Sequence, residues 1–456
     1  MSHYDVIVMG GGPGGYIAGE RLAHVGKKVL VAEQEALGGT CLNVGCIPTK
    51  SLLNGAKLYA HALHSAPFGV TASGVSYDWA AMQAWKAKTV DTLVGGVGAM
   101  LKRLGCEVAN AHATLVAPGV VDVGGQRHTC EHVIVATGSY PAMPPIPGTR
   151  DNPAVVDSTG LLAIEAVPQR LALIGGGVIG VEFASLFAAL GSKVDVVEMM
   201  DEICPFMDAD VAAALRRGIS GVDFHLRARV TAVEGGTVVF TDAKGAERRI
   251  EADTILMAVG RRPLVEGWGA AEAGLDHSAS GVVVDDRMRT NLPNVWAVGD
   301  VTGRSLLAHA AYRMGEIAAA HIIDPVAATR AGQVMRWDAI PWAVYSLPEA
   351  AGVGLTEAQA SERFGSALTA RVPLALSGRF VAENGLKAPG TVKLVAEPAT
   401  RRIVGVHMLG TYAPETIWGA VSVLENEFTV DEARQLVFPH PTVSEGIREA
   451  LWAVRD

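Results

Sequence analysis

Residues 6–15 read Val-Ile-Val-Met-Gly-Gly-Gly-Pro-Gly-Gly, and residues 171–180 read Leu-Ala-Leu-Ile-Gly-Gly-Gly-Val-Ile-Gly. In each stretch a short apolar run, typical of a buried strand, leads into a G-x-G-x-x-G loop. A helical pattern and a second apolar strand follow, with the second strand at Lys28–Ala32 in one case and at Lys193–Val197 in the other. Each stretch therefore predicts a βαβ unit, and the repeat predicts an α/β fold.

The glycines of these loops have three tasks in a βαβ unit that binds a dinucleotide. They allow the tight turn, bring backbone N–H groups close to a pyrophosphate, and let the helix pack on the strand. The same pattern can also be a strand–helix turn without a ligand. The positions concerned are Gly10, Gly12 and Gly15 in the first loop and Gly175, Gly177 and Gly180 in the second.

An acidic residue after the second strand of each unit favours the dinucleotide interpretation. Glu33 lies 23 residues after Gly10, and Glu198 lies 23 residues after Gly175. A carboxylate at this position can bind ribose hydroxyls, so the sequence predicts two dinucleotide sites. Because a carboxylate repels a 2′-phosphate, Glu198 favours NAD over NADP.

The length of the chain and the proline and glycine stretches that interrupt it indicate several domains. A chain of 456 residues predicts roughly three domains. The proline-rich stretch 141–148 indicates a boundary near 145, and weaker boundaries follow Gly260-Arg-Arg-Pro263 and the helical stretch 308–323. From about 335 the pattern is that of an α+β domain, with strands at 392–396 and 403–409 and helices near 414–425 and 430–436.

Composition and charge exclude several classes of protein. The net charge of −9 offers no general electrostatic footprint for nucleic acid. No basic segment precedes the first apolar run, and no apolar run has the length and purity of a membrane span, so neither a signal peptide nor a membrane helix is expected. Five cysteines are too few for a secreted disulfide framework, which favours the cytoplasm: Cys41, Cys46, Cys106, Cys130 and Cys204.

Two of the cysteines lie in Gly38-Gly-Thr-Cys-Leu-Asn-Val-Gly-Cys-Ile-Pro-Thr-Lys50, shortly after Glu33. With Gly45 between them, Cys41 and Cys46 can approach across a distorted helical turn and form a strained, reducible bridge. Two alternatives are a pair of buried thiols and half of a metal site. The second lacks further His or Cys ligands within the next dozen residues, and no metal site is expected.

This cysteine segment resembles the redox-active motif of the pyridine nucleotide–disulfide oxidoreductase family, which includes dihydrolipoamide dehydrogenases, glutathione reductases and mercuric reductases. The resemblance extends along the whole chain, to Ala136-Thr-Gly-Ser139, Ala297-Val-Gly-Asp300, Leu307-Ala-His-Ala310 and His440-Pro-Thr-Val-Ser-Glu445. It implies two Rossmann-like domains, for FAD and NAD, and a C-terminal α+β dimerisation domain. The implied ranges are 1–145 and 266–334 for FAD, 146–265 for NAD and 335–456 for dimerisation.

The resemblance also assigns cofactor-binding residues. The first loop and Glu33 are expected to bind FAD, and the second loop and Glu198 to bind NAD. Lys50 and Glu182 are expected to pair beside the flavin N5, although a solvated Lys and a helix-surface Glu are simpler alternatives. Ala113 stands where a glycine is common in the family, and Thr49 replaces a more usual Ser. The remaining assigned positions are Thr40, Thr137, Gly138, Ser139, Gly260, Asp300, Leu306, Leu307, Ala308 and His309.

The family's chemistry implies a role for each of four residues. Cys46 would lie beside the flavin, and Cys41 would exchange with the substrate. His440 would be the base that generates the attacking thiolate, oriented by Glu445 and supplied by the other subunit of a homodimer. A histidine before a proline can also be an ordinary surface residue, but the surrounding motif favours the catalytic interpretation.

Several details resemble the lipoamide branch of the family, including Leu42, Ile47, the run Val197–Glu202 and the absence of a C-terminal cysteine pair. Phe438 departs from the His-Ala-His that many of its members carry before the catalytic histidine. The expected activity is oxidation of a free or protein-bound dihydrolipoyl group by NAD, with a 2-oxo acid dehydrogenase or glycine cleavage complex as a partner. The alternatives are a related NAD(P)H-dependent disulfide or metal-ion reductase, and a structural flavin-binding subunit of a multienzyme complex.

Overall fold

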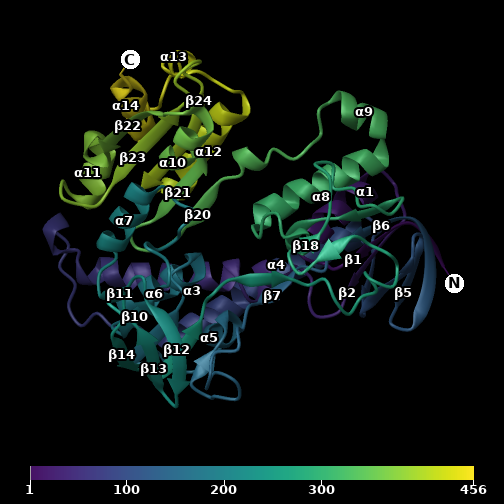
Figure 1. The fold of residues 1–456 in the computed structure, drawn as a ribbon, viewed down its shortest axis with the longest axis horizontal. Helices are drawn as coiled ribbons and strands as arrows, with labels where there is room; N and C mark the ends of the chain where they lie inside the picture. The colour runs from purple at the N-terminus through teal and green to yellow at the C-terminus, as the bar shows by residue number, and fades with distance from the viewer. Residues whose placement is uncertain (1, 456) are drawn as a thin grey trace. The chain divides into compact units, whose positions relative to one another are not determined.

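The computed structural model describes residues 2–455, and Figure 1 shows the order of the helices and strands along the chain. Contacts divide the chain into two compact units, which are described separately. Unit 1 consists of Met1–Leu52, Ala80–Ala142 and Gly260–Arg336, and unit 2 of Leu53–Trp79, Met143–Val259 and Trp337–Asp456. Both units contain sheets and helices, so the predicted α/β fold is confirmed.

A seven-stranded sheet forms the centre of unit 1. Its middle strands are parallel and almost wholly buried, which explains their continuous apolar sequences. The order is β3 (Glu107–Asn110), β2 (Val29–Glu33), β1 (His3–Met9), β6 (Gln126–Val135), β5 (Val120–Val123) and β4 (Ala113–Ala117), with β19 (Val295–Ala297) also pairing with β6.

Two helices of unit 1 pack closely against each other, as Figure 1 shows. They are α1 (Pro13–His24) and α8 (Ala308–Ile323). A Cβ atom at Gly315 would lie 2.5 Å from the carbonyl oxygen of Gly14, so the missing side chain permits the close crossing. The other elements of the unit include α2 (Gly39–Asn43), α9 (Pro325–Arg330), η2 (Gly299–Thr302), β7 (Ser139–Pro141), β16 (Arg261–Pro263), β17 (His277–Ser278) and β18 (Gly281–Val282). Helix α3 (Cys46–Leu63) continues from unit 1 into unit 2, and α4 (Trp79–Arg103) has its first residue in unit 2 and the rest in unit 1.

The first part of unit 2 contains a second, five-stranded parallel sheet. Its order is β11 (Val222–His225), β10 (Lys193–Val197), β9 (Arg170–Ile174), β15 (Thr254–Met257) and β8 (Val155–Val156). Its helices are α5 (Ser158–Leu162), α6 (Val178–Ala189) and α7 (Ala209–Gly218), and a three-stranded antiparallel sheet is made by β12 (Arg229–Glu234), β13 (Thr237–Thr241) and β14 (Glu247–Glu251).

The C-terminal part of unit 2 is an antiparallel sheet with helices packed on it, as expected for an α+β domain. The strand order is β20 (Trp342–Val344), β21 (Ala350–Gly354), β24 (Ile403–Leu409), β23 (Thr391–Ala396) and β22 (Leu368–Pro373). The helices are α10 (Glu357–Phe364), α11 (Gly378–Asn384), α12 (Ala413–Glu425), α13 (Val430–Ala433) and α14 (Glu445–Ala453).

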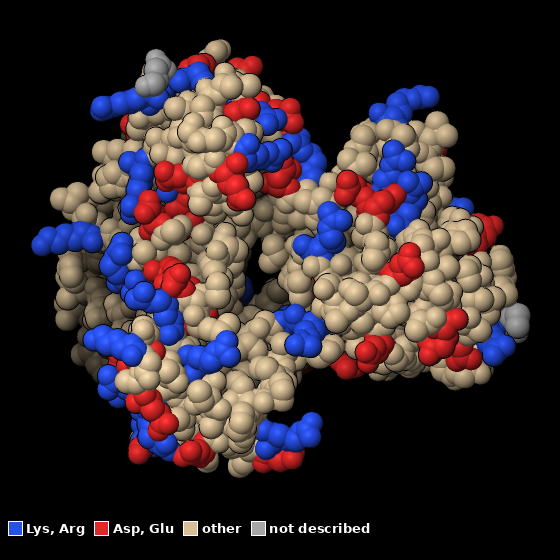
Figure 2. Space-filling model, in the orientation of Figure 1, with Lys and Arg blue, Asp and Glu red and all other residues tan. Residues whose placement is uncertain are grey.

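The helix predicted at 430–436 is too long, because α13 ends at Ala433. Leu436 and Val437 are exposed, so no packing extends the helix to them, and Pro439 disfavours helical backbone at the residue before it. None of the helices within residues 2–455 combines the length and apolar character needed to cross a membrane. Figure 2 shows acidic and basic side chains interspersed over the face that it draws.

Candidate functional site

The two glycine loops have nearly the same backbone conformation. Gly10 and Gly175 have φ angles of +109° and +108°, which only glycine adopts without strain. The last glycine of each loop lies against the first: a Cβ atom at Gly15 would be 2.0 Å from the oxygen of Gly10, and one at Gly180 would be 2.1 Å from that of Gly175. Both loops therefore require glycine at these positions for steric reasons.

The acid that follows each loop contacts it in the same way. Oε2 of Glu33 accepts a hydrogen bond from the Gly11 amide at 2.7 Å, and Oε2 of Glu198 accepts one from the Gly176 amide at 2.6 Å. The second oxygen of each carboxylate accepts from the amide two residues further along the chain, at 2.8 Å for Glu33 and 2.7 Å for Glu198. Each acid is thus held at the edge of its loop, where a ribose would lie.

The helix that follows each loop begins without a side-chain cap. Gly12 is the N-cap of α1 and Gly177 the N-cap of α6, and neither helix start receives a side-chain hydrogen bond. A Cβ atom at Gly177 would have no neighbour within 4 Å, and one at Gly12 would have its nearest neighbour at 3.9 Å. The open space and the uncapped N–H groups fit a pyrophosphate at both loops.

Other residues assigned to FAD follow neighbouring parallel strands of unit 1. Thr137–Ser139 follow β6, and Asp300 follows β19, at the edge where β1 ends in the first loop. The Ser139 hydroxyl donates to Oδ2 of Asp300 at 2.6 Å, and burial raises the pKa of this carboxyl group. The Thr137 hydroxyl donates to the Leu264 oxygen at 3.0 Å. Ligands bind at this edge of an open α/β sheet, where α8 also begins, with Leu306 and Leu307 before it and Ala308 and His309 in its first turn.

Arg261 connects this edge to the cysteine segment and was missed by the sequence analysis. Its Nη2 atom donates to Oγ1 of Thr40 at 3.2 Å and to the Ser139 oxygen at 2.7 Å, while its Nε atom donates to the Ser139 hydroxyl at 2.8 Å. In the sequence it is marked by its place between Gly260 and Pro263, which indicates a boundary and not a ligand site.

The cysteine segment forms two helices separated by a break. Cys41 lies in α2 and Cys46 begins α3. Nδ2 of the Asn43 side chain donates to the backbone oxygens of Leu37 and Gly39, which holds α2 in place. A Cβ atom at Gly45 would lie 2.8 Å from the Thr40 oxygen, so the break requires a glycine. The two helices meet with the cysteines at the junction.

Both cysteines are free thiols, and the side chain of Cys41 is hydrogen-bonded to that of Cys46. This bond, followed by burial and the charge of Cys46, raises the pKa of Cys41, whereas Lys50 acts in the opposite direction. The pair can therefore share one proton in the reduced state, and Lys50 favours the thiolate.

The cysteine pair lies beside the first glycine loop. The Gly38 amide donates to the Gly11 oxygen at 2.8 Å, and a Cβ atom at Gly39 would lie 2.8 Å from Cα of Gly12. Because Cys41 is only two residues from Gly39, the cysteine pair and the loop that fits a pyrophosphate lie next to each other. The sequence indicates the same proximity, because the cysteine segment follows Glu33 after only a few residues.

A pair of tyrosines adjoins the cysteines and was also missed. The Tyr16 hydroxyl donates to that of Tyr312 at 2.7 Å, and the rings make an edge contact. Burial raises the pKa of both phenols, and the charge of Cys41 raises both further. Tyr16 follows the first glycine loop and Tyr312 lies in α8, and no spacing in the sequence connects them.

His440 and Glu445 form a hydrogen-bonded pair near the C-terminus. Nδ1 of His440 lies 2.9 Å from Oε1 of Glu445, whose other oxygen accepts from the Thr442 amide at 3.0 Å. The Thr442 amide and His440 together lower the pKa of Glu445. The His440 side chain is 77% exposed, so its ring is oriented by the carboxylate and accessible to another molecule.

The remaining predicted residues lie in different surroundings. Glu182 is 3% exposed and accepts a hydrogen bond from the Tyr345 amide at 3.0 Å, so the simpler interpretation as a helix-surface residue is wrong. Ala113 is buried in β4, and Gly260 has a φ of +105°. Lys50 and Glu182 belong to different units, and their pairing stays a prediction. Residues 2–455 contain no group of three or more His, Cys, Asp or Glu side chains placed to hold a metal ion.

Comparison with known protein families identifies both parts of the chain. Residues 4–315 match the model of pyridine nucleotide-disulphide oxidoreductases, and residues 340–451 match the dimerisation domain of the same proteins. The chain belongs to this family. Its members and their dihydrolipoyl dehydrogenase relatives use FAD and NAD, which confirms the prediction of these two cofactors.

Curated members of the family are similar to this chain over nearly its full length. A dihydrolipoyl dehydrogenase of Thermus scotoductus is 38% identical and covers 100% of this chain and 98% of its own. One of Bacillus subtilis is 36% identical over 98% of this chain and 95% of its own. A leghemoglobin reductase of Glycine max is 36% identical over 99% of this chain and 88% of its own.

Solved structures of the family have the same fold. The Cu(II) complex of the HOCl-induced flavoprotein disulfide reductase RclA from Escherichia coli superposes with a TM-score of 0.87, at 28% identity over the whole of both chains. LpdA from Mycobacterium tuberculosis also has a TM-score of 0.87, at 26% identity over 99% of both chains. The predicted architecture of dinucleotide-binding domains and a C-terminal dimerisation domain is thereby confirmed.

Proposed function

We propose that this family member oxidises a dihydrolipoyl dithiol to the lipoyl disulfide and reduces NAD to NADH. The observation that carries the proposal is the cysteine pair packed on the first glycine loop, with a second loop of the same geometry elsewhere in the chain. The similarity of 36–38% to several dihydrolipoyl dehydrogenases supports the choice of substrate.

Cys41 and Cys46 exchange a disulfide with the substrate. A substrate thiolate attacks the sulfur of Cys41 in the oxidised pair and releases Cys46 as a thiolate; the second substrate thiolate then displaces Cys41 and leaves as the lipoyl disulfide. Bound FAD supplies the electron transfer from the reduced pair to NAD. Lys50 helps to hold negative charge in the pair, since its ammonium group favours the thiolate form of Cys41.

His440 is the base that removes the substrate thiol protons. Nδ1 faces Glu445, so Nε2 is the nitrogen available to the substrate. Glu445 keeps the tautomer and stabilises the imidazolium, in the same way that a buried carboxylate does in a Ser-His-Asp triad. The Thr442 amide fixes Glu445 in turn, so the dyad has a fixed orientation on an exposed surface.

The exposed position of this dyad supports a homodimer in which each subunit supplies His440 and Glu445 to the cysteines of the other. Val437, three residues before His440, is 96% exposed, and Trp418 of α12 and Trp452 of α14 are 74% and 57% exposed. Aromatic side chains are enriched in the buried centre of protein interfaces. These residues lie within or next to the range that matches the family's dimerisation domain.

The finer assignments rest on individual residues. Glu198 supports NAD over NADP, because its fixed carboxylate would repel a 2′-phosphate. A cytoplasmic location is supported by the small number of cysteines in a long chain. A 2-oxo acid dehydrogenase or glycine cleavage complex would supply the dihydrolipoyl group as a protein-bound substrate.

A second candidate is reduction of another disulfide or of a metal ion with NADH, which the likeness to the Cu(II) complex of RclA supports. Steady-state assays separate the candidates. Dihydrolipoamide with NAD should give a kcat/KM far above those for glutathione disulfide with NADPH and for Cu(II) with NADH. Equal or reversed ratios would refute the dihydrolipoyl substrate.

A further inference from the structure

The segment between β10 and α7 lies against the second glycine loop. This stretch, residues 199–208, follows Glu198 directly and is called the 199–208 segment. The Cys204 amide donates to the Gly176 oxygen at 2.9 Å, and a Cβ atom at Gly176 would lie 3.2 Å from both Cβ of Glu198 and Cγ2 of Ile203. The Met200 amide also donates to Glu198. The segment therefore contacts both the Glu198 carboxylate and the second glycine loop.

The far end of the segment is anchored by a buried acid. Asp208 caps α7, where its Oδ1 atom accepts from the Asp210 amide at 3.2 Å. Its other oxygen accepts from the Glu357 amide, at the start of α10, at 3.1 Å. Asp208 is almost completely buried, so its charge needs a partner inside the protein.

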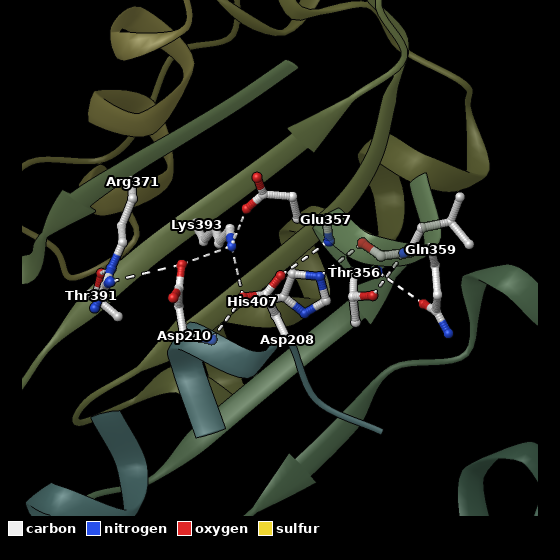
Figure 3. Close-up of polar contacts among 10 residues, drawn as sticks. Asp208, Asp210, Thr356, Glu357, Gln359, Arg371, Thr391, Lys393 and His407 are labelled. Carbon is white, nitrogen blue, oxygen red and sulfur yellow. Dashed lines mark hydrogen bonds and ion pairs between the residues drawn. The ribbon is translucent and has the colours of Figure 1, made fainter. Parts of the chain in front are cut away.

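Lys393 of β23 is that partner, as Figure 3 shows. Its Nζ atom lies 2.8 Å from Oδ1 of Asp208, 3.0 Å from Asp210 and 2.6 Å from Glu357. The side chains of Lys393 and Asp208 are 4% and 3% exposed, whereas those of Asp210 and Glu357 are about half exposed. The Lys393–Asp208 pair is therefore the buried part of the cluster.

The charges within the cluster depend on Lys393. Burial lowers the pKa of Lys393, but the three carboxylates outweigh it and bring the pKa to about 12, so the amine is protonated. Burial alone would raise the pKa of Asp208, but the hydrogen bonds from Lys393 and the Glu357 amide outweigh burial, so the pKa of Asp208 is lowered and the carboxylate is charged. Burial lowers the pKa of the neighbouring His407, whose Nε2 contacts the Leu355 oxygen at 2.9 Å, so this ring adds no charge near neutral pH. The positive charge that faces Asp208 comes from Lys393.

We propose that Lys393 is a positioning residue for the pyridine nucleotide site. Its ion pair keeps the Asp208 carboxylate buried and so fixes the end of the 199–208 segment. The segment in turn keeps Glu198 and the second glycine loop in the geometry that binds the nucleotide ribose. Without Lys393 the buried Asp208 charge has no counter-charge, so the carboxylate moves toward water and the segment loses its anchor. The inference rests on the proposed binding of NAD at the second loop.

The test is NAD binding to the FAD-loaded dimer of Lys393→Met, measured by titration calorimetry. The Kd for NAD should rise about two- to thirtyfold, the range typical of residues that act on a site from a distance. The reduction of the same variant by dihydrolipoamide without NAD, followed in a stopped-flow instrument, should keep its wild-type rate. Amide hydrogen exchange should accelerate at Met200, Ile203 and Cys204.

Three variants complete the experiment. Lys393→Arg keeps the charge and should keep a Kd close to that of the wild type. Glu357→Gln removes a half-exposed partner of the same lysine and should leave the Kd within about twofold, as expected for an exposed pair. Adding Asp208→Asn to Lys393→Met removes the unpaired buried charge and should recover part of the binding.

A wild-type Kd for Lys393→Met, whether or not its thermal stability falls, would overturn the inference. Glu198→Gln separates that result from a failure of the proposed site: if it weakens NAD binding while Lys393→Met does not, only the role of Lys393 is wrong. If neither variant changes the Kd, the second loop is not the NAD site. Should Lys393→Met not fold, Asp208→Asn breaks the same pair from its other side and decides by the same measurements.

Discussion

Nδ1 of His440 lies 2.9 Å from Oε1 of Glu445, and the same carboxylate accepts a hydrogen bond from the Thr442 amide. The carboxylate contacts only Nδ1, so Nε2 of the exposed His440 ring is accessible to a substrate. This arrangement predicts that the acid acts on catalysis through the histidine, because its own oxygens are both occupied.

Glu445→Gln should lower the rate of dithiol oxidation by about ten- to a hundredfold, part of the 10²–10⁴ that a positioned acid–base group supplies. The pKa of Glu445 in the folded protein lies below its ordinary value of 4.5, so the carboxylate is charged at any pH above 4.5. The His440–Glu445 pair is lost only when the pH falls through this lowered pKa. The loss in rate should therefore persist from pH 5 to 8. Glu449→Gln, in the same helix, is the matched control, and equal rates for both variants would contradict the role of Glu445.

Cys46→Ser should abolish the long-wavelength absorption that a thiolate beside FAD gives when the enzyme is reduced anaerobically by NADH or a dithiol. Cys41→Ser should retain this absorption and lose dithiol oxidation, because Cys41 faces the substrate in the proposed mechanism. Cys106→Ser is the control, since this thiol is buried elsewhere in unit 1 and its pKa is raised to about 11. A wild-type spectrum that passes straight to fully reduced flavin would count against the disulfide mechanism.

Lys50→Met should move the appearance of this thiolate absorption to higher pH. The charge of Lys50 lowers the pKa of Cys41 in the hydrogen-bonded pair, so removing it raises that pKa and leaves less thiolate in the pair at a given pH. A pH titration of the reduced enzyme measures the shift. Lys102→Met, which removes an exposed charge in the last turn of α4, should leave the curve unchanged.

Glu198→Gln should raise the KM for NAD by about tenfold or more, because a hydrogen bond to a charged group contributes about 1.5–3 kcal/mol. It should raise the KM for NADP less or lower it, because the repulsion of a 2′-phosphate is gone. The ratio of the two kcat/KM values gives the result. Asp201→Asn, whose side chain is 91% exposed, should leave the ratio unchanged, and a similar change in both variants would indicate an effect of net charge alone.

Gly45→Ala should destabilise the fold by about 1–3 kcal/mol, the usual range for an added methyl group in a packed position. The new Cβ atom would lie 2.8 Å from the Thr40 oxygen and would separate α2 from α3, so thiol–disulfide exchange should slow as well. Thermal unfolding and thiol titration measure the two effects. Gly95→Ala has no neighbour within 4 Å of its Cβ and should be neutral or stabilise the exposed helix by up to about 1 kcal/mol.

The elements with a strong apolar period could be predicted from the sequence. Strands Lys193–Val197 and Ile403–Leu409 and helix Ala308–Ile323 have the predicted bounds. The sequence analysis did not anticipate α4, whose glycines at 95, 96 and 98 each disfavour a helix by up to about 1 kcal/mol relative to alanine, although none of them makes a close contact there. It also missed β12 to β14, since a strand such as Glu247–Glu251 is mostly charged and forms only by pairing with its neighbour.

The candidate site divides in the same way. Some of its residues can be recognised from short, regular spacings along the chain, namely the glycine loops, Glu33, Glu198 and the cysteine pair. Arg261 is 221 residues from its partner Thr40 in the sequence, and Lys393 is 185 residues from Asp208. Nothing near either cation in the sequence indicates such a distant partner. These contacts exist only once the sheets have formed.

Gly10 and Gly175 differ by 1° in φ, and the N-cap residues Gly12 and Gly177 have the same φ and differ by 1° in ψ. FAD and NAD share their ADP half, and its pyrophosphate and ribose are the groups that the two loops would bind in the proposed function. The loops therefore cannot tell the two ligands apart. Selectivity must be encoded where the ligands differ, so grafting one loop onto the other in a redesigned enzyme would leave ligand preference intact.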